Sequence, residues 1–295
     1  MRFKIIGSGG CVSTPRPLCG CRVCAQAREK GHPYARCGCS LYAEDINMLI
    51  DTPEDIVYAL NNSNIQSIDS ILYSHIDPDH TMGMRVLEQL RLDWLRYSVE
   101  GKACDNPIEI ASLPRIIKDL RKQGTKYGSA LDYYESMDLI KVSSFYQRVY
   151  NQSAYNQSAY NQLELELIPV DTEENVTVFV FKQGNHKVIY APCDVKPFPE
   201  NEIFYNADYL IIGNTIIGDI LKNGFILKED NPLRKELFTL EEIMDLKDRY
   251  HIKKAVLTHI EEDWGKTYDD YLILQKQYKD LEFAYDGLVI DTALL

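Results

Sequence analysis

Residues 70–83 read SILYSHIDPDHTMG, an apolar run followed at once by a cluster of polar side chains. The run Ser70–Ser74 predicts a buried strand. Directly behind it, four side chains that can bind a metal fall within six residues: His75, Asp77, Asp79 and His80. Nitrogen and oxygen ligands packed this closely suit a divalent cation. A polar loop that caps the next helix would explain Asp79 or His80 alone, but it does not explain all four together.

A second predicted strand ends in the same manner. The segment Lys254–Thr258 runs directly into His259. A ligand at the end of a buried strand is held by a rigid element, as a metal site requires. We therefore expect His80 and His259, which are far apart in the sequence, to converge on a shared cation.

Composition excludes several classes of protein. The 295 residues carry 32 basic and 44 acidic side chains, and the net charge of −12 argues against a protein that mainly binds nucleic acid. A hydrophobic content of 45% allows a sizeable core and excludes global disorder. The chain has no run of about 18 apolar residues, so no membrane helix is predicted. The start MRFKIIGSGG is too quickly polar for a signal peptide, so we expect a cytoplasmic protein.

Strand and helix patterns alternate along both halves of the chain. Further strands are predicted at Arg2–Ile6, Ser40–Ala43, Asn47–Asp51, Ile108–Ala111, Leu163–Pro169, Val176–Lys182, Lys187–Ala191 and Tyr209–Ile212. Helices are predicted at Glu54–Asn61, Gly83–Tyr97, Leu113–Lys122, Thr239–Tyr250 and Thr267–Tyr278, with Thr239 and Glu242 forming a capping box. This order predicts an α/β fold of two mixed β-sheets packed face to face, with helices on the outer faces. We expect a single domain over residues 1–295, with residues 144–162, which contain the repeat YNQSA, as a low-complexity excursion.

Six of the eight cysteines lie in the first forty residues, and three of them form the motif Cys19-x-Cys21-x-x-Cys24. Without a secretion signal, such a cluster indicates metal binding rather than disulfides. The stretch 19–39 has little periodicity and predicts an ordered zinc-binding loop, because a structural zinc takes four ligands and Cys37 and Cys39 add two more thiols. Reduced, buried cysteines without a metal are the alternative. We expect Cys11, Cys104 and Cys193 to be packing residues.

These features together resemble the metallo-β-lactamase superfamily. The polar loop after Ser74 is similar to its H-x-H-x-D-H signature, and the glycine loop 7–10, the three-cysteine motif, Asp51-Thr52 and Leu257-Thr258-His259 also match in order. The best match is the branch of phosphonate-pathway cyclic phosphodiesterases and tRNA 3′-processing endonucleases. The resemblance implies an αββα sandwich with a metal site at one edge of the two sheets. It also implies that Asp194 is the bridging carboxylate.

Two positions depart from the family pattern. Asp77 replaces the second His of the signature, and Asp171-Thr172 stands where another His is usual; we expect the nearby His186 to be a surface residue. By the family's roles, one metal pocket would hold Asp79, His80, Asp194 and His259. The other would hold His75, Asp77 and Asp194, with Asp171 as a substitute. Carboxylates in place of imidazoles weaken a preference for zinc, so zinc, manganese, iron or magnesium are candidates, with one firm metal and the second weak, different or absent.

For the cysteine loop, the resemblance implies a structural zinc held by Cys19, Cys21 and Cys24. The family's fourth ligand, a His, is Glu262 here. We therefore rank Cys39 first as the fourth ligand, then Cys37, then Glu262. Three arginines around this loop are candidates for binding a substrate phosphate, although exposed arginines are usually only solvated: Arg16, Arg22 and Arg36.

The leading functional hypothesis is a metal-dependent hydrolase, most plausibly a phosphodiesterase that acts on a small or cyclic phosphate ester. In such enzymes metal-bound water becomes hydroxide near neutral pH and attacks the ester. Asp77 and Asp79 are the candidate catalytic carboxylates, and Glu261, Glu262 and Asp263 are further acid–base candidates, of which at least two should be solvated surface residues. The alternatives are a lactone or thioester hydrolase, and a non-catalytic binding protein that keeps the fold and the structural zinc. A homodimer is compatible with the sequence, which does not fix the oligomeric state.

Overall fold

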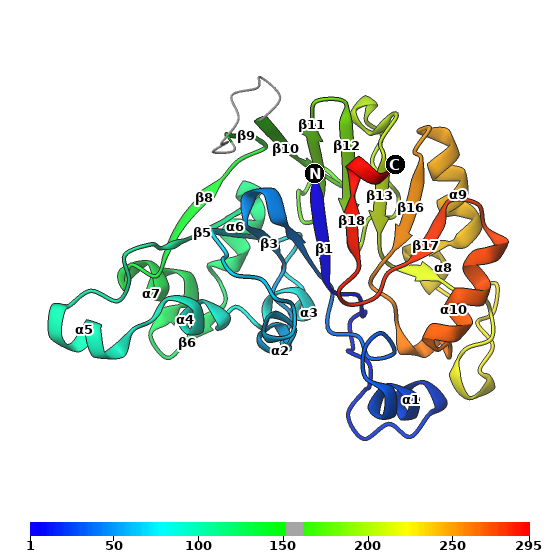
Figure 1. Ribbon diagram of the computed structural model, residues 1–295, viewed down its shortest axis with the longest axis horizontal. Coiled ribbons are helices and arrows are strands. Elements are labelled where there is room, and N and C mark those ends of the chain that lie inside the picture. Colours follow the sequence, from blue (N-terminus) through cyan, green and yellow to red (C-terminus); the bar gives the residue numbers. More distant parts are fainter. Residues whose placement is uncertain (152–161) are drawn as a thin grey trace.

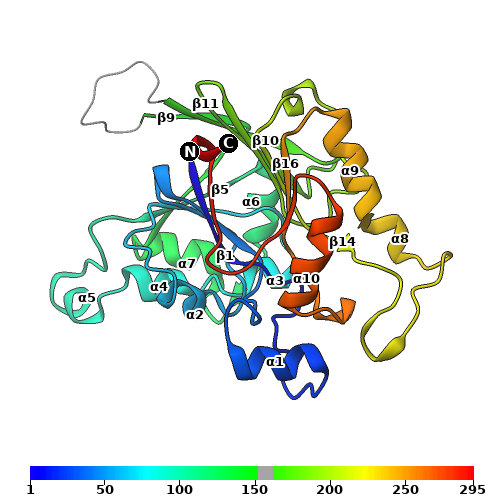
Figure 2. The same cartoon turned by 45° about the vertical axis from the view of Figure 1, so that its right-hand side comes forward.

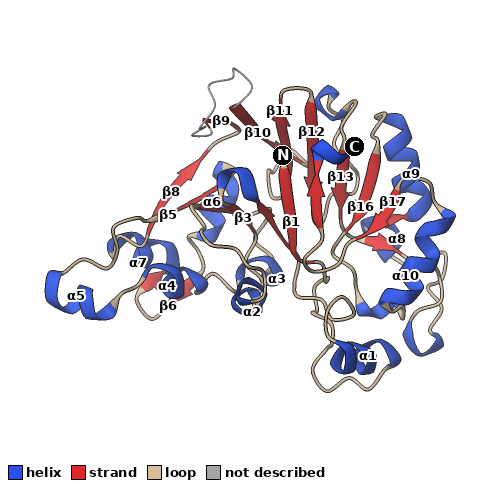
Figure 3. Cartoon of the chain, viewed as in Figure 1, coloured by secondary structure: helices blue, strands red, loops and turns tan. Residues whose placement is uncertain are grey.

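The computed structural model describes residues 1–151 and 162–295, which build two mixed seven-stranded sheets (Figures 1 and 3). In spatial order, the first sheet contains β18 (Val289–Asp291), β1 (Arg2–Gly7), β2 (Ser40–Ala43), β3 (Met48–Ile50), β4 (Ser70–Leu72), β5 (Ile108–Ser112) and β8 (Ile140–Ser144). The second contains β17 (Leu281–Phe283), β16 (Lys254–Leu257), β13 (Tyr209–Ile212), β12 (His186–Ala191), β11 (Thr177–Gln183), β10 (Gln162–Pro169) and β9 (Gln147–Asn151). Two short pairs stand apart from these sheets, β14 (Thr215–Ile216) with β15 (Phe238–Thr239) and β6 (Gly124–Thr125) with β7 (Gly128–Ser129).

The two sheets share an apolar core. Phe3 of the first sheet meets Phe181 of the second with ring centroids 4.9 Å apart, and both rings are fully buried. The opposite face of the second sheet carries a separate apolar cluster, in which Leu210 and Leu257 pack with Ile243 and Leu246 of a helix. The predicted fold class is therefore confirmed: two face-to-face mixed sheets with helices outside.

Helices cover the outer sides of this sandwich (Figure 2). The helices of the described residues are α1 (Arg22–Lys30), α2 (Ile56–Asn61), α3 (Pro78–Thr81), α4 (Val86–Arg91), α5 (Trp94–Glu100), α6 (Pro114–Leu120), α7 (Ala130–Ser136), α8 (Leu233–Glu236), α9 (Leu240–Arg249) and α10 (Tyr268–Leu274). Of these, α1 lies beyond one edge of the sheets. Helix α9 begins at the predicted capping box, in which the Thr239 hydroxyl accepts from the Glu242 N–H and the Glu242 carboxylate accepts from the Thr239 N–H. In the described parts of the chain, no helix has the length and apolar content needed to cross a membrane.

Four strand ends meet at one edge of the sandwich. Strands β3 and β4 run parallel in the first sheet, and β12, β13 and β16 run parallel in the second. The carboxyl ends of parallel strands face the same way, which is where α/β folds place their ligands. The segments that leave β3, β4, β12 and β16 begin with or soon reach Asp51, His75, Asp194 and His259. This edge is therefore where the candidate ligands can converge.

Two local expectations differ from the structure, and a third cannot be compared with it. The helix predicted over Gly83–Tyr97 is two helices, because Leu92 is extended and the Asp93 carboxylate accepts from the N–H groups of Leu95 and Arg96 as the N-cap of α5. The cysteine-rich stretch contains α1, which buries so few side chains that no apolar period marks it. Residues 152–161 of the low-complexity excursion lie outside the described residues; on either side, β9 and β10 pair in antiparallel register.

Candidate metal centre

Three ligand atoms from two distant segments form a nearly equilateral triangle. His80 Nε2 and His259 Nε2 are 3.3 Å apart, and Asp79 Oδ2 lies 3.3 Å from each of them. A tetrahedral zinc ion with bonds of about 2.0–2.1 Å separates its ligand atoms by about 3.3–3.4 Å. Both imidazoles are almost fully buried. The triangle therefore has the size and the nitrogen and oxygen donors that a tetrahedral cation takes.

Asp51, at the end of β3, orients the imidazole of His80. Its Oδ2 accepts a hydrogen bond from His80 Nδ1 at 2.8 Å, so in the neutral imidazole it is Nε2 that carries the lone pair a metal would take. The same carboxylate accepts from the Ser74 N–H at 2.8 Å and from the Ser74 hydroxyl at 2.7 Å. Because that hydroxyl donates to Asp51, it accepts from His75 Nδ1 at 2.9 Å. One buried carboxylate thus fixes the tautomers of two imidazoles.

A second group of donors lies beside the first. His75, Asp77 and Asp194 each place a ligand atom within 4.8 Å of the others, with His75 Nε2 3.7 Å from Asp77 Oδ2. Asp194 belongs to this group and not to the group of Asp79, His80 and His259, with which the resemblance also placed it. Asp171 is used elsewhere, since its carboxylate accepts from the N–H groups of Glu173 and Glu174 in the turn after β10. His186 lies at the surface, as expected, with its ring beside Asp208.

Cys193 also lies in the centre, although the sequence suggested only a packing role. Its Sγ forms a third group with ring nitrogens of His75 and His80, all within 4.8 Å of one another. The amide of Asn214 donates to Cys193 Sγ at 3.0 Å and to Asp194 Oδ1 at 3.1 Å. Cys193 directly precedes the predicted ligand Asp194, and this position was the one signal in the sequence; a single buried cysteine is otherwise indistinguishable from a packing residue.

Two properties of the protein fit a cation at this place. His75 Nε2 is buried and has no hydrogen-bond partner among the described residues, which is costly for a polar atom unless something else pairs with it. Three residues at strand ends also have left-handed backbones: Asp51 (φ 66°), Asp194 (φ 52°) and His259 (φ 51°). Such conformations cost about 1–3 kcal/mol each and cluster at functional sites.

Charge interactions shift the acid–base properties of these groups. Burial opposes ionisation of Asp79, but hydrogen bonds from His259 and His80 hold its pKa far below the usual range. Burial and the neighbouring Cys193 raise the pKa of Asp194 to about 6. Burial also opposes ionisation of the Cys193 thiol, but the surrounding imidazoles lower its pKa well below the ordinary value. The anionic forms of Asp79 and Cys193 are therefore stabilised by the imidazoles around them.

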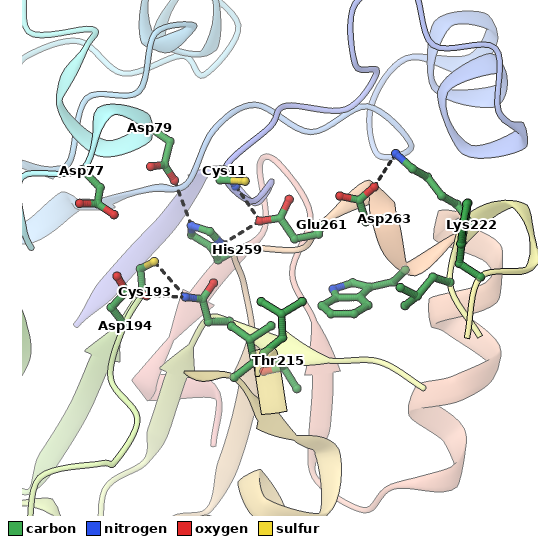
Figure 4. Close-up of a pocket in the computed structure, with 16 residues that line it drawn as sticks. Cys11, Asp77, Asp79, Cys193, Asp194, Thr215, Lys222, His259, Glu261 and Asp263 are labelled. Atoms are coloured by element: carbon green, nitrogen blue, oxygen red, sulfur yellow. Dashed lines mark hydrogen bonds and ion pairs between the residues drawn. The ribbon is translucent and has the colours of Figure 1, made fainter. Parts of the chain in front are cut away.

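A pocket of about 420 Å³ opens directly onto this centre (Figure 4). One wall carries the polar groups Asp77, Asp79, Asp194, His259 and Glu261. The other wall is apolar and comes mostly from the segment between β14 and β15: Leu221, Phe225, Leu233, Leu237 and, from beyond that segment, Trp264. The sequence did not predict this wall, because the segment has no helical or strand period that would place it over the site.

Glu261 connects the glycine loop to the site. Its Oε1 accepts from the Cys11 N–H at 2.7 Å and lies 3.5 Å from His259 Nδ1. A Cβ at Gly10 would overlap the Glu261 carboxylate, so a larger residue there would displace this carboxylate. Burial raises the pKa of Glu261, so this group is suited to exchange a proton inside the pocket.

The three predicted thiols meet Glu262, the candidate ranked third. Cys19, Cys21, Cys24 and Glu262 hold their ligand atoms within 4.8 Å of one another, with Cys21 Sγ 3.5 Å from Glu262 Oε2. Cys39, which we ranked first, lies elsewhere, with its Sγ 3.5 Å from the Tyr190 hydroxyl. Cys37 lies with His32 and Asp286. Cys39 lies apart from the three thiols because it is buried directly before β2, whereas the 3-10 turn Glu262–Trp264 brings Glu262 to the cysteine loop.

The three arginines near the cysteine loop are occupied by protein groups. Arg16 pairs with Glu262 at 3.4 Å, and Arg22 pairs with Asp270 at 2.5 Å. Arg36 is buried and donates to the Ser8 hydroxyl and the Ala284 carbonyl. None of the three is among the described residues that line the pocket. The arrangement therefore favours a structural role for them.

Comparison with solved structures identifies proteins that share this fold. No family model matches the sequence, and no curated protein does either. Among solved structures, the chain is similar to zinc-bound PqqB from Methylobacterium extorquens (18% identity, 99% of this chain and 100% of that chain, TM-score 0.68) and to a diphosphatase from the PhnP family (17%, 98% and 97%, 0.65). It is also similar to the metallo-β-lactamase fold protein YhfI from Bacillus subtilis (14%, 98% and 99%, 0.59). The fold that the resemblance implies is confirmed: the chain has the metallo-β-lactamase fold.

Proposed function

We propose that this protein is a metal-dependent hydrolase whose principal cation is held by Asp79, His80 and His259. The observation that carries the proposal is the triangle of their ligand atoms, with all three edges at 3.3 Å. Asp51 supports it by presenting His80 Nε2 in the ligating tautomer. His75, Asp77 and Asp194 supply a second, carboxylate-richer set beside it.

In the proposed reaction, the carboxylates of the pocket have different roles. A divalent cation at such a site acidifies water and polarises the oxygen of a phosphoryl or carbonyl group. Asp77 lies in the pocket with about half of its side chain exposed, so it can accept a proton from the attacking water. Glu261, buried and with a raised pKa, is placed to donate a proton to the leaving group. Asp79 stays ionised and acts as a ligand.

We propose a small phosphodiester as the first substrate class. The similar diphosphatase of the PhnP family supports phosphate chemistry on this fold. The volume of about 420 Å³ suits a small molecule rather than a polymer. The net charge of −12 and the acidic wall of the pocket also disfavour a nucleic-acid substrate.

A carbonyl ester, such as a lactone or thioester, is the second candidate, and the pocket itself favours it. Lys222 is the one Lys or Arg among the described lining residues, and it already pairs with Glu262 and Asp263. A phosphate would therefore depend on bound metal for its positive partners. An uncharged ester with an apolar substituent would instead match the Leu221, Phe225 and Leu237 wall.

We also propose that Cys19, Cys21, Cys24 and Glu262 hold a structural zinc. Three sulfurs and one carboxylate complete the four ligands of a closed tetrahedral site. The site would attach α1 to the turn that begins at Glu262, two segments that are about 240 residues apart in the sequence.

One experiment tests the hydrolase proposal. Protein purified without chelator is analysed for metal and assayed with a chromogenic phosphodiester and a chromogenic carboxylic ester. We expect two to three metal equivalents per chain and activity on one ester, with His80→Ala losing an equivalent and the activity. His186→Ala, at the far end of β12, is the matched control and should keep both. A metal content that His80→Ala leaves unchanged, with no hydrolysis of either ester, would instead identify a binding protein.

A further inference from the structure

The thiol of Cys193 has no role in the chemistry described above, yet it stands among the imidazoles. Cys193 follows β12 directly after Pro192 and is 5% exposed. Its Sγ lies within 4.8 Å of ring nitrogens of both His75 and His80, so the three donors span the space between the two proposed metal positions. A cysteine that served only as packing would sit among apolar side chains, as those of the sandwich core do.

An independent observation points to a ligand at the same spot. His75 is 2% exposed, and its Nε2 has no hydrogen-bond partner among the residues that the structure describes. Its other nitrogen is taken by the Ser74 hydroxyl, so in the neutral imidazole Nε2 carries a lone pair, and the Asp77 carboxylate lies 3.7 Å from it. A buried acceptor of this kind is costly unless a cation or a donor meets it. Cys193 Sγ lies within 4.8 Å of a His75 ring nitrogen.

Asn214 fixes the thiol in an orientation for ligation. Its amide donates to Cys193 Sγ at 3.0 Å and, with the same nitrogen, to Asp194 Oδ1 at 3.1 Å. A donor to sulfur leaves the remaining sulfur lone pairs for another partner and ties two successive residues into one rigid unit. Support of this kind is typical of metal ligands.

We propose that Cys193 is a thiolate ligand of the second metal position, together with His75 and Asp194. The inference rests on the proposed function, because it assumes that this centre binds metal. Cys193 then replaces the imidazoles that Asp77 and Asp171 do not supply. A sulfur donor favours zinc or cobalt over magnesium or manganese. The second position should therefore prefer zinc or cobalt, whereas Asp77 and Asp171 in place of imidazoles predict a preference for harder ions such as manganese or magnesium.

Cobalt spectroscopy on the full chain tests the assignment. The Cys19, Cys21, Cys24 and Glu262 site is left loaded with zinc, while a mild chelator empties the pocket, which is then titrated with cobalt(II). X-ray absorption at the cobalt edge then reports on the pocket alone. We expect a sulfur scatterer at about 2.3 Å and a thiolate-to-cobalt charge-transfer band in the near ultraviolet. A cobalt site with only nitrogen and oxygen neighbours overturns the proposal and needs no variant that might misfold.

Variants separate this inference from the proposed function. Cys193→Ser should lose the charge-transfer band and bind cobalt about tenfold or more weakly. Cys104→Ser is the matched control: Cys104 is also buried, donates to the Asp138 carbonyl, and should keep the band. If His80→Ala abolishes cobalt uptake but Cys193→Ser leaves the band intact, the metal centre stands and the thiolate assignment is wrong. If His80→Ala does not alter cobalt uptake at all, the proposed active site itself is wrong.

Discussion

Replacing Asp51 with Asn should weaken metal binding without any contact between residue 51 and the metal. The carboxylate is fully buried and accepts three hydrogen bonds, from the Ser74 N–H, the Ser74 hydroxyl and His80 Nδ1. An amide has almost the same shape but only one accepting end. If its oxygen stays on the Ser74 N–H, its NH₂ group donates to His80 Nδ1 and moves the imidazole proton to Nε2, the ligating atom. If it flips, two N–H donors face each other in a buried site.

Both orientations have a cost that can be estimated. Loss of such an orienting carboxylate typically lowers metal affinity about 10–100-fold, which corresponds to about 1.4–2.8 kcal/mol. A buried donor left unpaired costs about 1–3 kcal/mol of folding stability. We therefore expect the dissociation constant of the pocket cation, measured by competition with a chromophoric chelator, to rise about 10–100-fold in Asp51→Asn. Urea denaturation of the apo forms should show a modest loss of stability.

Asp208→Asn is the matched control. Asp208 is equally buried and contacts His186 Nδ1, the Lys187 N–H and Lys253 Nζ, but it lies at the opposite end of β12 and β13. It should lose stability and keep its metal affinity. Wild-type affinity in Asp51→Asn, or an equal loss of affinity in Asp208→Asn, would refute the orienting role of Asp51.

Three further predictions follow from contacts at other places. Burial opposes ionisation of Asp208, but the Lys253 ammonium holds the pKa of this carboxyl in the folded protein below the ordinary 3.8. The ionised carboxylate therefore stabilises the fold above pH 3.8, and this stabilisation is lost as the pH falls through the folded-state pKa. In Asp208→Asn, the free energy of unfolding should therefore fall less steeply at acid pH. Cys21→Ser should release one zinc equivalent and lower the melting temperature by about 2–4 °C per kcal/mol lost, measured by calorimetry, whereas unchanged zinc content would exclude the four-ligand site. Phe225→Ala should raise KM about tenfold, or about 1.5 kcal/mol, for an ester with an aryl substituent and leave a methyl ester unaffected; equal effects on both would argue against an apolar subsite.

The sequence predicted the sandwich and the strand ends at which the candidate ligands meet, because both kinds of evidence lie in short segments. A single segment such as Ser70–His75 shows an apolar strand and the ligand that ends it, and the same holds for Lys254–His259. Periodicity needs no knowledge of distant contacts. Prediction therefore succeeded where local pattern and final position coincide.

The remaining site features depend on tertiary placement. Glu262 meets Cys21 only because the turn after β16 folds back onto α1, and no spacing along the chain encodes that meeting. In the sequence, Cys193 cannot be told from an ordinary buried cysteine, because only the fold places it beside His75 and His80. The apolar wall at Leu221 and Phe225 breaks the usual rule that large apolar side chains are buried, since Phe225 is 68% exposed.

The run Glu261-Glu262-Asp263 joins two places that otherwise share no residue. Glu261 and Asp263 face the pocket, while the carboxylate between them faces the thiols of Cys19, Cys21 and Cys24. A displacement at the middle residue must move both of its neighbours, because they share one turn of backbone. In the proposed hydrolase, reagents that oxidise or alkylate those thiols would thus lower activity although they react outside the pocket.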